Sequence, residues 1–370
     1  MTNPRHARHS RIPFGVLVAV LLGLVAAIAW ATTRGVGRDG GTGAAAATAG
    51  GSPTPTASTS TGDTVGVSPG GAAAATTPTE TTAPQPPKQD LVIHATGDVS
   101  LDPDYIPAFR ANGYDWAWTG LHGLFRRDDL TIINHECPST DVVAPIPKEF
   151  SFRCDPAALP VAKRFGVDVA NLANNHGFDQ GPEGLLDSIR NMRRAGIVPV
   201  GAGANQREAD APAYVEVKGW RIAIVGVGEV LGPDYQVAVG NRPGTAVGHD
   251  FPRAIRSIRA ADAHADLVLV VIHWGVELDT EPREYQIDEA RRMIRAGADA
   301  IFGHHAHRLQ PMETVLGRPV FYGLGNFVWP NLSVAGSTTA VAEVTVTADG
   351  RIRGRLLPAF IAAPGHPELR

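Results

Sequence analysis

The chain has 370 residues, and its 33 Lys and Arg residues nearly balance its 37 Asp and Glu residues, giving a formal net charge of -4. This length suits one large domain or two modest ones. A balanced charge lacks the basic surface that nucleic-acid binders use, so we expect no nucleic-acid partner.

An uncharged apolar run occupies residues 14–31. At about 18 residues, it reaches the minimum length with which a helix spans a bilayer. Three arginines precede this run, namely Arg5, Arg8 and Arg11. By the positive-inside rule we predict a single-pass signal anchor in the cell membrane, with residues 1–13 in the cytoplasm and the main domain extracellular.

The alternative to an anchor is a cleaved signal peptide, because residues 27–29 and 29–31 both form small-residue cleavage sites. The apolar core of a signal peptide is usually about 7 to 15 residues long, which is shorter than this run. Both interpretations export the rest of the chain.

Residues 32–90 consist mainly of Gly, Ala, Thr, Ser and Pro and contain no aromatic residue. Such a composition cannot bury enough apolar surface to offset the chain entropy that folding removes. We therefore predict a disordered linker, with a mean reach of about 4 nm, between the membrane and a folded domain at residues 91–360.

From residue 91 onward, short β-rich runs alternate with helical segments. Strands are predicted at 91–96, 130–134, 167–172, 221–227, 266–273, 298–303 and 320–324, and helices at 156–165, 182–195, 252–263 and 285–296. Near-continuous apolar strands such as 267–272 indicate sheets that are covered on both faces. Residues 340–347 and 351–357 predict a terminal hairpin, and the whole pattern indicates an α/β sandwich.

Polar clusters follow five of the predicted strands, at the carboxyl ends where open α/β sheets bind ligands. The clusters are Thr96-Gly97-Asp98, Asn134-His135-Glu136, Asn174-Asn175-His176, His273-Trp274-Gly275-Val276-Glu277 and Gly303-His304-His305-Ala306-His307. Taken singly, each has an ordinary interpretation as a turn, a helix cap or a satisfied polar side chain. Together they predict a metal site, and in an extended segment His305 and His307 would point to the same side.

The ligand types constrain the metal. Imidazole and carboxylate without an obvious thiolate suit Mn²⁺, Fe or Zn²⁺. Five or six protein ligands exceed one tetrahedral site and suit two ions about 3.5–4 Å apart, a centre that lowers the pKa of bound water and polarises the oxygen under attack. We therefore expect a divalent metal, as one or two ions, and hydrolytic chemistry.

The two cysteines, Cys137 and Cys154, fit an exported protein. A disulfide between them closes a short loop and contributes on the order of 3 kcal/mol in the chain-entropy model. Two free buried thiols are the alternative, because a domain of this size does not need the bridge in order to fold.

Between residue 91 and about residue 358 the chain carries an ordered set of motifs: Gly97-Asp98, Asn134-x-Glu136, Leu172-Ala173-Asn174-Asn175-His176, Gly201-Ala202-Gly203, His273-Trp274-Gly275-x-Glu277, Gly303-His304-His305-x-His307 and Gly323-Leu324-Gly325-Asn326-Phe327. This set resembles the CapA family of poly-γ-glutamate capsule proteins. It implies a four-layer α/β/β/α sandwich related to calcineurin-like metallophosphoesterases. It also implies a role in making or exporting poly-γ-glutamate, an anionic polymer, with a membrane-bound ligase and small membrane subunits as partners.

The resemblance also implies roles for individual residues. The residues that match metal ligands are Asp98, Glu136, Asn175, His273, His305 and His307. His176 matches a catalytic histidine that acts without binding metal. We assign substrate binding to Asn174, Glu277 and His304.

Two positions depart from the family pattern. Ser100 stands where metallophosphoesterases usually carry a histidine, which predicts a weaker or a single metal site. The usual Met-Leu-Gly-Arg sequence after the first aspartate is absent, so its arginine is lost or replaced by Arg110 or Arg153. A metal-dependent hydrolase and a non-catalytic, polymer-binding scaffold with a structural metal both remain open. His176 favours the enzyme, and Ser100 favours the scaffold.

Overall fold

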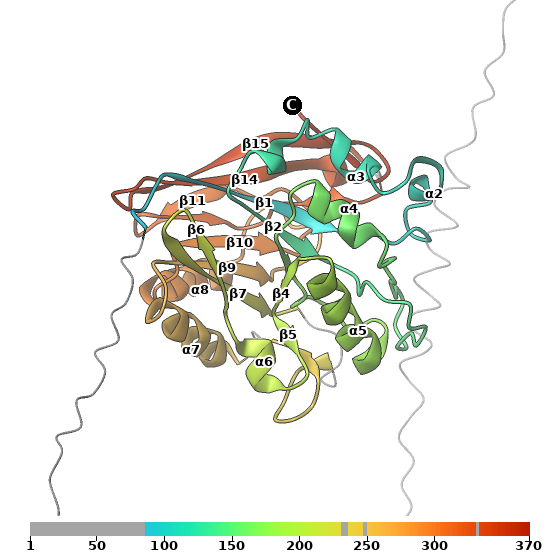
Figure 1. Ribbon diagram of the computed structural model, residues 1–370, viewed down its shortest axis with the longest axis horizontal. Coiled ribbons are helices and arrows are strands. Elements are labelled where there is room, and N and C mark those ends of the chain that lie inside the picture. The colour runs from blue at the N-terminus through green and yellow to red at the C-terminus, as the bar shows by residue number, and fades with distance from the viewer. Residues whose placement is uncertain (1–85, 231–235, 247–249, 331–332) are drawn as a thin grey trace, which may run out of the picture. The chain divides into compact units, whose positions relative to one another are not determined.

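The computed structural model describes residues 86–230, 236–246, 250–330 and 333–370 (Figure 1). The predicted anchor at residues 14–31 lies outside these ranges, as does the predicted linker up to residue 85. Within the ranges described, none of the helices combines the length and the apolar character needed to cross a membrane.

The first of two large sheets joins a parallel half to an antiparallel edge. Its strand order is β16 (His366–Leu369), β15 (Ile352–Ala363), β14 (Thr338–Val346), β1 (Leu91–Val99), β2 (Leu130–His135), β3 (Val169–Asn171) and β4 (Val198–Val200), and β13 (Asn326–Val328) also pairs with β1. Neighbours from β1 to β4 are parallel, whereas β14, β15 and β16 are antiparallel. The predicted terminal hairpin is confirmed as β14 and β15.

The second sheet also has a parallel centre. Its strand order is β11 (Met312–Val315), β12 (Arg318–Phe321), β10 (Ala300–His304), β9 (Leu267–His273), β7 (Trp220–Gly228) and β6 (Ala213–Val217). The edge strands β6 and β11 are antiparallel to their neighbours. A separate small pair is formed by β5 (Ala202–Gly203) and β8 (Gly244–Thr245).

The two sheets pack face to face, which explains the continuous apolar runs in their central strands. In β9, Leu267 and Leu269 lie in the apolar cluster that joins both sheets, whereas Val268 and Val270 lie in the cluster on the opposite side. Successive side chains of a strand point to opposite faces. A strand that is buried on both faces therefore needs an apolar residue at almost every position.

Helices cover the outer face of each sheet (Figure 1). The first sheet is covered by α2 (Ala108–Asn112), α3 (Trp116–Thr119), α4 (Ala158–Arg164) and α5 (Gly181–Arg194), and the second by α7 (Phe251–Asp262) and α8 (Glu284–Arg295). Shorter elements are η1 (Leu124–Arg126), α6 (Gln206–Asp210) and α9 (Val334–Ser337). The fold is thus a mixed α/β arrangement of helix, sheet, sheet and helix layers. The predicted helices are confirmed as α4, α5, α7 and α8.

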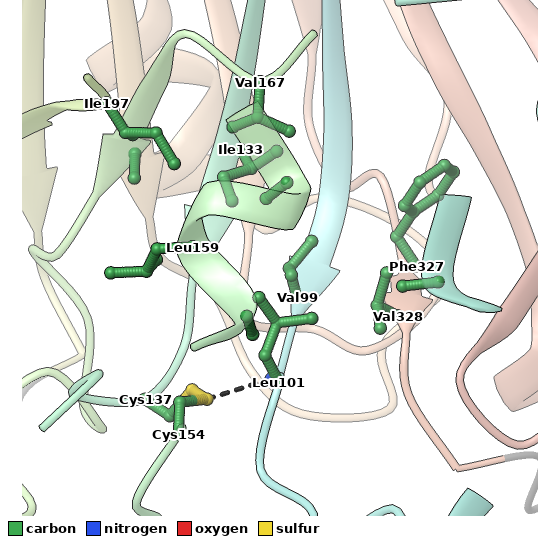
Figure 2. Packing of buried hydrophobic residues seen from close by; sticks show 14 of the residues in the cluster. Val99, Leu101, Ile133, Cys137, Cys154, Leu159, Val167, Ile197, Phe327 and Val328 are labelled. Atoms are coloured by element: carbon green, nitrogen blue, oxygen red, sulfur yellow. Dashed lines mark hydrogen bonds between the residues drawn. A yellow bond between two sulfur atoms is a disulfide. The ribbon is translucent and has the colours of Figure 1, made fainter. Parts of the chain in front are cut away.

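A disulfide joins Cys137 to Cys154 inside the apolar cluster on the outer face of the first sheet (Figure 2). The two Cα atoms are 5.7 Å apart. The backbone N–H of Leu101 donates to Cys154 Sγ at 2.9 Å, which ties the bridge to the segment that follows β1. The bridge closes a loop that begins directly after Glu136.

The first sheet continues past residue 360, where the sequence pattern placed the end of the domain. Strand β15 runs to Ala363, and β16 is anchored where the His366 ring stacks on Trp116, with ring centroids 3.8 Å apart. The strands β6, β11 and β16 were missed as well. Each is a short edge strand with few buried residues, so it lacks the apolar run by which the central strands are recognised.

Candidate metal centre

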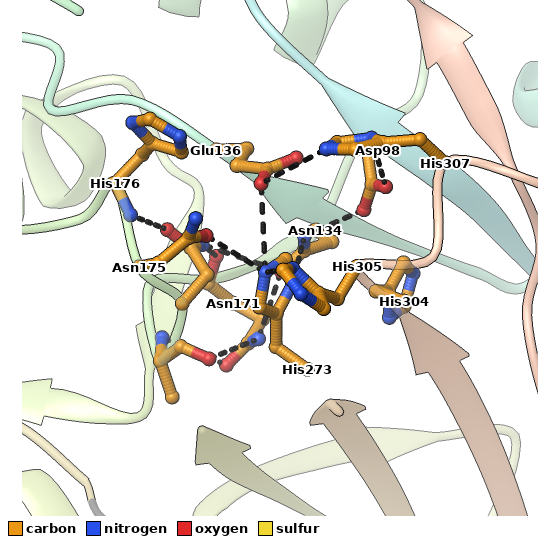
Figure 3. A network of polar contacts seen from close by, with 12 residues as sticks. Asp98, Asn134, Glu136, Asn171, Asn175, His176, His273, His304, His305 and His307 are labelled. Carbon is orange, nitrogen blue, oxygen red and sulfur yellow. Dashed lines mark hydrogen bonds and ion pairs between the residues drawn. The ribbon is translucent and has the colours of Figure 1, made fainter. Parts of the chain in front are cut away.

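The carboxyl ends of the parallel strands in both sheets converge on one cluster of polar side chains (Figure 3). The strands β1, β2 and β3 and the residues that follow them supply Asp98, Glu136 and Asn175, while β9 and β10 and the residues that follow supply His273, His305 and His307. The structure therefore brings all six predicted ligands together.

One group of potential ligands consists of Asp98, Glu136 and His307, whose ligand atoms all lie within 4.8 Å of one another. His307 Nδ1 lies 3.1 Å from Asp98 Oδ2, and His307 Nε2 lies 3.9 Å from Glu136 Oε1. Asn326 Oδ1 accepts a hydrogen bond from His307 Nδ1 at 2.8 Å. Hydrogen bonds of this kind orient the ring of a metal-binding histidine.

Glu136 also belongs to a second group, with His273 and His305, whose ligand atoms lie within the same 4.8 Å. His305 Nδ1 lies 3.1 Å from His273 Nε2, which lies 3.5 Å from Glu136 Oε1. Asn175 Oδ1 lies 2.8 Å from the same His273 nitrogen. Because Glu136 is common to both groups, these residues could together hold one or two divalent ions.

Burial and mutual charge shift the pKa values of these side chains in different directions. Burial and the charge of Asp98 raise the pKa of Glu136 well above its ordinary value. Burial lowers the pKa of His273 strongly and lowers the pKa of His305 to about 4. Burial also acts to lower the pKa of His307, but Glu136 and Asp98 outweigh it and raise that pKa to about 9.

The environment of Glu136 fits a bound cation. Among the described residues, none donates a hydrogen bond to either of its carboxylate oxygens, although the side chain is fully buried. A buried carboxylate without such partners is costly, and a cation relieves that cost. The donors beside it are imidazole nitrogens and a carboxylate, which divalent metals such as Zn²⁺ and Mn²⁺ accept. The residues present therefore fit a divalent metal.

The two histidines that follow β10 have a left-handed backbone. The φ angle is 88° at His305 and 51° at His307, a region that residues other than glycine seldom adopt. The expectation of an extended segment is therefore wrong, because a tight turn rather than strand alternation directs both imidazoles inward. Such conformations persist where the surrounding structure holds them, and they cluster at functional sites.

His176 lies beside the two groups and belongs to neither. Its Nδ1 lies 2.7 Å from Asp179 Oδ2, and Asp179 also accepts from Lys148 Nζ at 2.7 Å and from the Phe152 N–H at 2.7 Å. Burial lowers the pKa of His176. The pairing leaves Nε2 as the ring nitrogen available for proton transfer. Asp179 was missed, and its spacing of three residues from His176 is the only signal in the sequence.

Asn174 and His304, which were predicted to bind substrate, are buried and form hydrogen bonds with backbone groups beside the site. Asn174 is fully buried, donates to the His135 carbonyl at 3.1 Å, and accepts from the His176 N–H at 3.1 Å. His304 is buried, with Nε2 at 2.8 Å from the Thr96 carbonyl and Nδ1 at 3.3 Å from a carbonyl of β9. Their assignment to substrate binding stays a prediction, and the strand-end pattern does not reveal which side chains turn back onto the sheet.

Asn134, at the end of β2, connects the two ligand groups. Its Nδ2 donates to Asp98 Oδ1 at 2.8 Å and lies 3.1 Å from His273 Nδ1. Its Oδ1 accepts from Asn171 Nδ2 at 2.9 Å. The sequence identified Asn134 only as part of a motif. Its contacts help to orient one candidate ligand from each sheet.

Ser100 and the two arginines named from sequence lie away from the centre. Ser100 Oγ lies 4.0 Å from Cys154 Sγ, so the side chain faces the disulfide. Arg110 is exposed and pairs with Asp104, and Arg153 Nη1 donates to a backbone carbonyl at 3.5 Å. Neither of these contacts involves a residue of the two ligand groups.

A cavity of about 220 Å³, here called the aromatic pocket, opens beside the centre. Its walls include Tyr105, Phe150, Phe152, Trp329, Glu277 and Arg308. Glu277 is thus the one predicted substrate-binding residue that lines it. His176 and His307 also line the pocket, so the pocket borders the centre.

The chain is similar to proteins of capsule synthesis along most of its length. It is 32% identical over 265 residues to the PGA biosynthesis protein CapA of Bacillus subtilis (strain 168), covering 71% of this chain and 69% of that protein. It is 30% identical over 260 residues to the capsule biosynthesis protein CapA of Bacillus anthracis, covering 68% and 63%. A hypothetical protein of Thermus thermophilus aligns with a TM-score of 0.46 and 15% identity, covering 72% of this chain and 99% of that one.

One family model matches most of the domain that carries the candidate ligands. The model of the family described as "Bacterial capsule synthesis protein PGA_cap" matches residues 92–331, a span from β1 to just past Trp329. This span contains all six predicted ligands. The chain belongs to the PGA_cap family of bacterial capsule synthesis proteins.

Proposed function

We propose that this chain is a membrane-anchored extracytoplasmic protein whose domain is a metal-dependent hydrolase in poly-γ-glutamate capsule synthesis or export. Family membership supports the capsule role, because the relatives in Bacillus are named for PGA and capsule biosynthesis. The observation that best supports a metal-dependent hydrolase is the buried carboxylate of Glu136. This carboxylate belongs to both groups of candidate ligands and receives no hydrogen bond from the described residues.

The proposed centre holds one or two divalent ions, of Mn, Fe or Zn. Its ligands are Asp98, Glu136, Asn175, His273, His305 and His307. The bound metal supplies Lewis acidity, which activates water and polarises the bond under attack. His176, held by Asp179, moves a proton to or from the substrate. Ligands at strand ends of a four-layer fold support a metallophosphoesterase-like arrangement.

We further propose that residues 14–31 anchor the chain, with residues 1–13 cytoplasmic and the domain outside the cell. The disulfide supports this location, because disulfides persist in oxidising compartments. There the domain works on an anionic polymer, beside a poly-γ-glutamate ligase and small membrane subunits. A mature N-terminus found by sequencing at residues 30–33 contradicts the anchor and leaves the export intact.

Metal analysis of the purified full-length protein tests the centre. We expect one or two ions per chain in the wild type and almost none in a combined His273→Ala, His305→Ala and His307→Ala variant, because the site is left incomplete. Arg110→Ala, which changes an exposed arginine, is the matched control and keeps its metal. Full occupancy in the triple variant contradicts the metal site.

A non-catalytic scaffold that binds polymer is the second candidate, because Ser100 faces the disulfide and contributes no ligand. Hydrolysis assays separate the two. The enzyme cleaves a phosphodiester test substrate or polyglutamate when metal is bound. If metal is present and neither substrate is cleaved, the scaffold is the correct function and the metal is structural.

A further inference from the structure

The aromatic pocket has a continuous wall of rings that runs from His176 to His307. Phe152 packs on His176 with ring centroids 4.3 Å apart, and Tyr105 packs on Phe152 at 4.5 Å. Trp329 continues the wall, 5.4 Å from Tyr105 and 4.9 Å from His307. Packed rings offer a ligand apolar surface and an electron-rich face, which suit methylene groups and cations.

Two opposite charges line the same pocket. Arg308 donates from Nη1 to the His307 carbonyl at 2.7 Å, which holds its guanidinium group beside the wall. Glu277 lines the pocket with an exposed side chain. A guanidinium matches a carboxylate with two parallel hydrogen bonds. The carboxylate of Glu277 attracts an ammonium group and repels a phosphate. A ligand that carries both an ammonium and a carboxylate therefore satisfies both charges.

The size of the pocket and its rim favour the end of a chain over an internal segment. A volume of about 220 Å³ lies below the roughly 300–1,000 Å³ of pockets that enclose drug-sized ligands, so it holds one small residue. The rim residues Phe150 and Leu278 are 56% and 60% exposed, and both are apolar. Phe150 and Leu278 offer no positive charge to a polyanion laid across them, whereas a single terminal residue fits inside and reaches Arg308.

We propose that the aromatic pocket binds the amino-terminal residue of a γ-glutamyl chain as a zwitterion. Arg308 pairs with its α-carboxylate, Glu277 pairs with its α-ammonium, and its two methylenes lie on the ring wall. The γ-carbonyl then extends toward Glu136 and His176. Only the first residue of such a chain has a free α-ammonium, so residues are removed one at a time from that end. The inference rests on the proposed function for the identity of the polymer.

The reaction at this site is hydrolysis of the γ-amide, with water as the second reactant. The water oxygen forms a bond to the γ-carbonyl carbon, and the bond from that carbon to nitrogen breaks. The departing nitrogen gains a proton, which His176 is placed to deliver. The products are free glutamate and a chain that is shorter by one residue.

Calorimetric binding of γ-glutamylglutamate to the metal-free full-length protein tests the pocket independently of activity. The N-acetylated dipeptide, which lacks the ammonium, is the comparison ligand. We expect the free dipeptide to bind at least about tenfold more tightly, as the loss of one charged hydrogen bond predicts. Glu277→Gln should abolish this preference. Arg308→Lys should weaken both ligands about tenfold, because lysine loses the paired geometry.

Arg110→Ala is the control for Arg308→Lys, since it alters an exposed guanidinium that pairs with Asp104, and it should bind both dipeptides as the wild type does. Equal affinity of the wild type for the two dipeptides overturns the inference, as does unchanged affinity in Arg308→Lys. Tighter binding of phenyl phosphate than of the dipeptide also overturns it. Failure of the proposed hydrolase appears separately, either as missing metal in the purified protein or as metal-bound protein that cleaves neither test substrate.

Discussion

The two sheets contribute different chemistry to one centre. The first sheet supplies candidate oxygen ligands from Asp98, Glu136 and Asn175, and the second supplies candidate nitrogen ligands from His273, His305 and His307. On the oxygen side, Asp98 lies near the carboxyl end of β1, where the strand register is irregular, and it accepts a hydrogen bond from Asn134. On the nitrogen side, His305 and His307 depend on a turn with positive φ angles.

This contrast shows how each half fixes its ligands. The oxygen side has a disulfide that starts one residue after Glu136, so its geometry is set by covalent and hydrogen-bonded links. The nitrogen side stores backbone strain, which the surrounding contacts must hold in place. Neither sheet supplies a full set of ligands by itself, so a metal ion would join the two. Changes on the two sides should therefore have different consequences.

The largest expected effect comes from Glu136, because it alone belongs to both groups. Glu136→Gln keeps the shape of the side chain and removes its charge, so we expect nearly all metal to be lost. His305→Ala removes a ligand from one group and should leave the ion of the other group bound. Elemental analysis of metal per chain measures both. Glu277→Gln, which changes the exposed carboxylate of the pocket, should keep its full metal content. A Glu136→Gln protein as metal-rich as the wild type rules out the shared carboxylate.

A large effect on rate without loss of metal should come from His176. His176→Ala should slow hydrolysis of a phosphodiester test substrate by about 10²–10⁴-fold if the side chain transfers a proton. Asp179→Asn should give a smaller loss, because the ring remains and only its orientation and charge partner change. Metal content should match the wild type in both variants. A His176→Ala protein that loses its metal would make this histidine a ligand instead.

Removal of the disulfide, which lies on the oxygen side, should have an effect of intermediate size. Removing it with Cys137→Ser and Cys154→Ser should lower the free energy of unfolding by about 3 kcal/mol, as measured by denaturant titration. We also expect weaker metal binding, since Glu136 loses its adjacent covalent tie. Reductant should destabilise the wild type and leave the double variant unchanged. Equal sensitivity of both proteins to reductant contradicts a bridge in the native protein.

The parallel centre of each sheet and the helices α4, α5, α7 and α8 could be predicted from sequence, because strands buried on both faces give long apolar runs. The polar clusters that contain the candidate ligands followed from the same signal. Once a strand such as β9 is recognised, the polar residues at its carboxyl end lie at the edge where ligands bind. The resemblance to the CapA family then singled out His273 and Glu136 within their clusters.

The parts that sequence missed depend on loops and on side-chain direction. Lys148 reaches Asp179 from the disulfide-closed loop, and Arg308 lines the pocket from the turn after β10, and neither segment has a periodic pattern. Asn174 and His304 follow strands as the ligands do, yet both turn onto backbone groups. The left-handed turn at His305 could not be expected either, because a non-glycine residue gives no sign of a positive φ.

The smallest expected effect is a pH dependence that comes from His307. Its pKa is raised from 6.5 to about 9 in the metal-free protein, where burial is outweighed by Glu136 and Asp98. The protonated ring therefore stabilises the metal-free fold below pH 6.5, and this contribution is lost as the pH rises through about 9.

A metal ion needs the neutral imidazole, so between these two pH values it must displace the proton of His307. One displaced proton makes the apparent metal affinity rise by about tenfold per pH unit, and the rise should end near the raised pKa. Calorimetry in buffers of different ionisation enthalpy counts the protons that are released. His307→Asn should release about one proton fewer than the wild type, whereas His176→Ala, which changes no ligand, should release the same number. If His307→Asn releases as many protons as the wild type, then a group other than His307 carries the proton that the metal displaces.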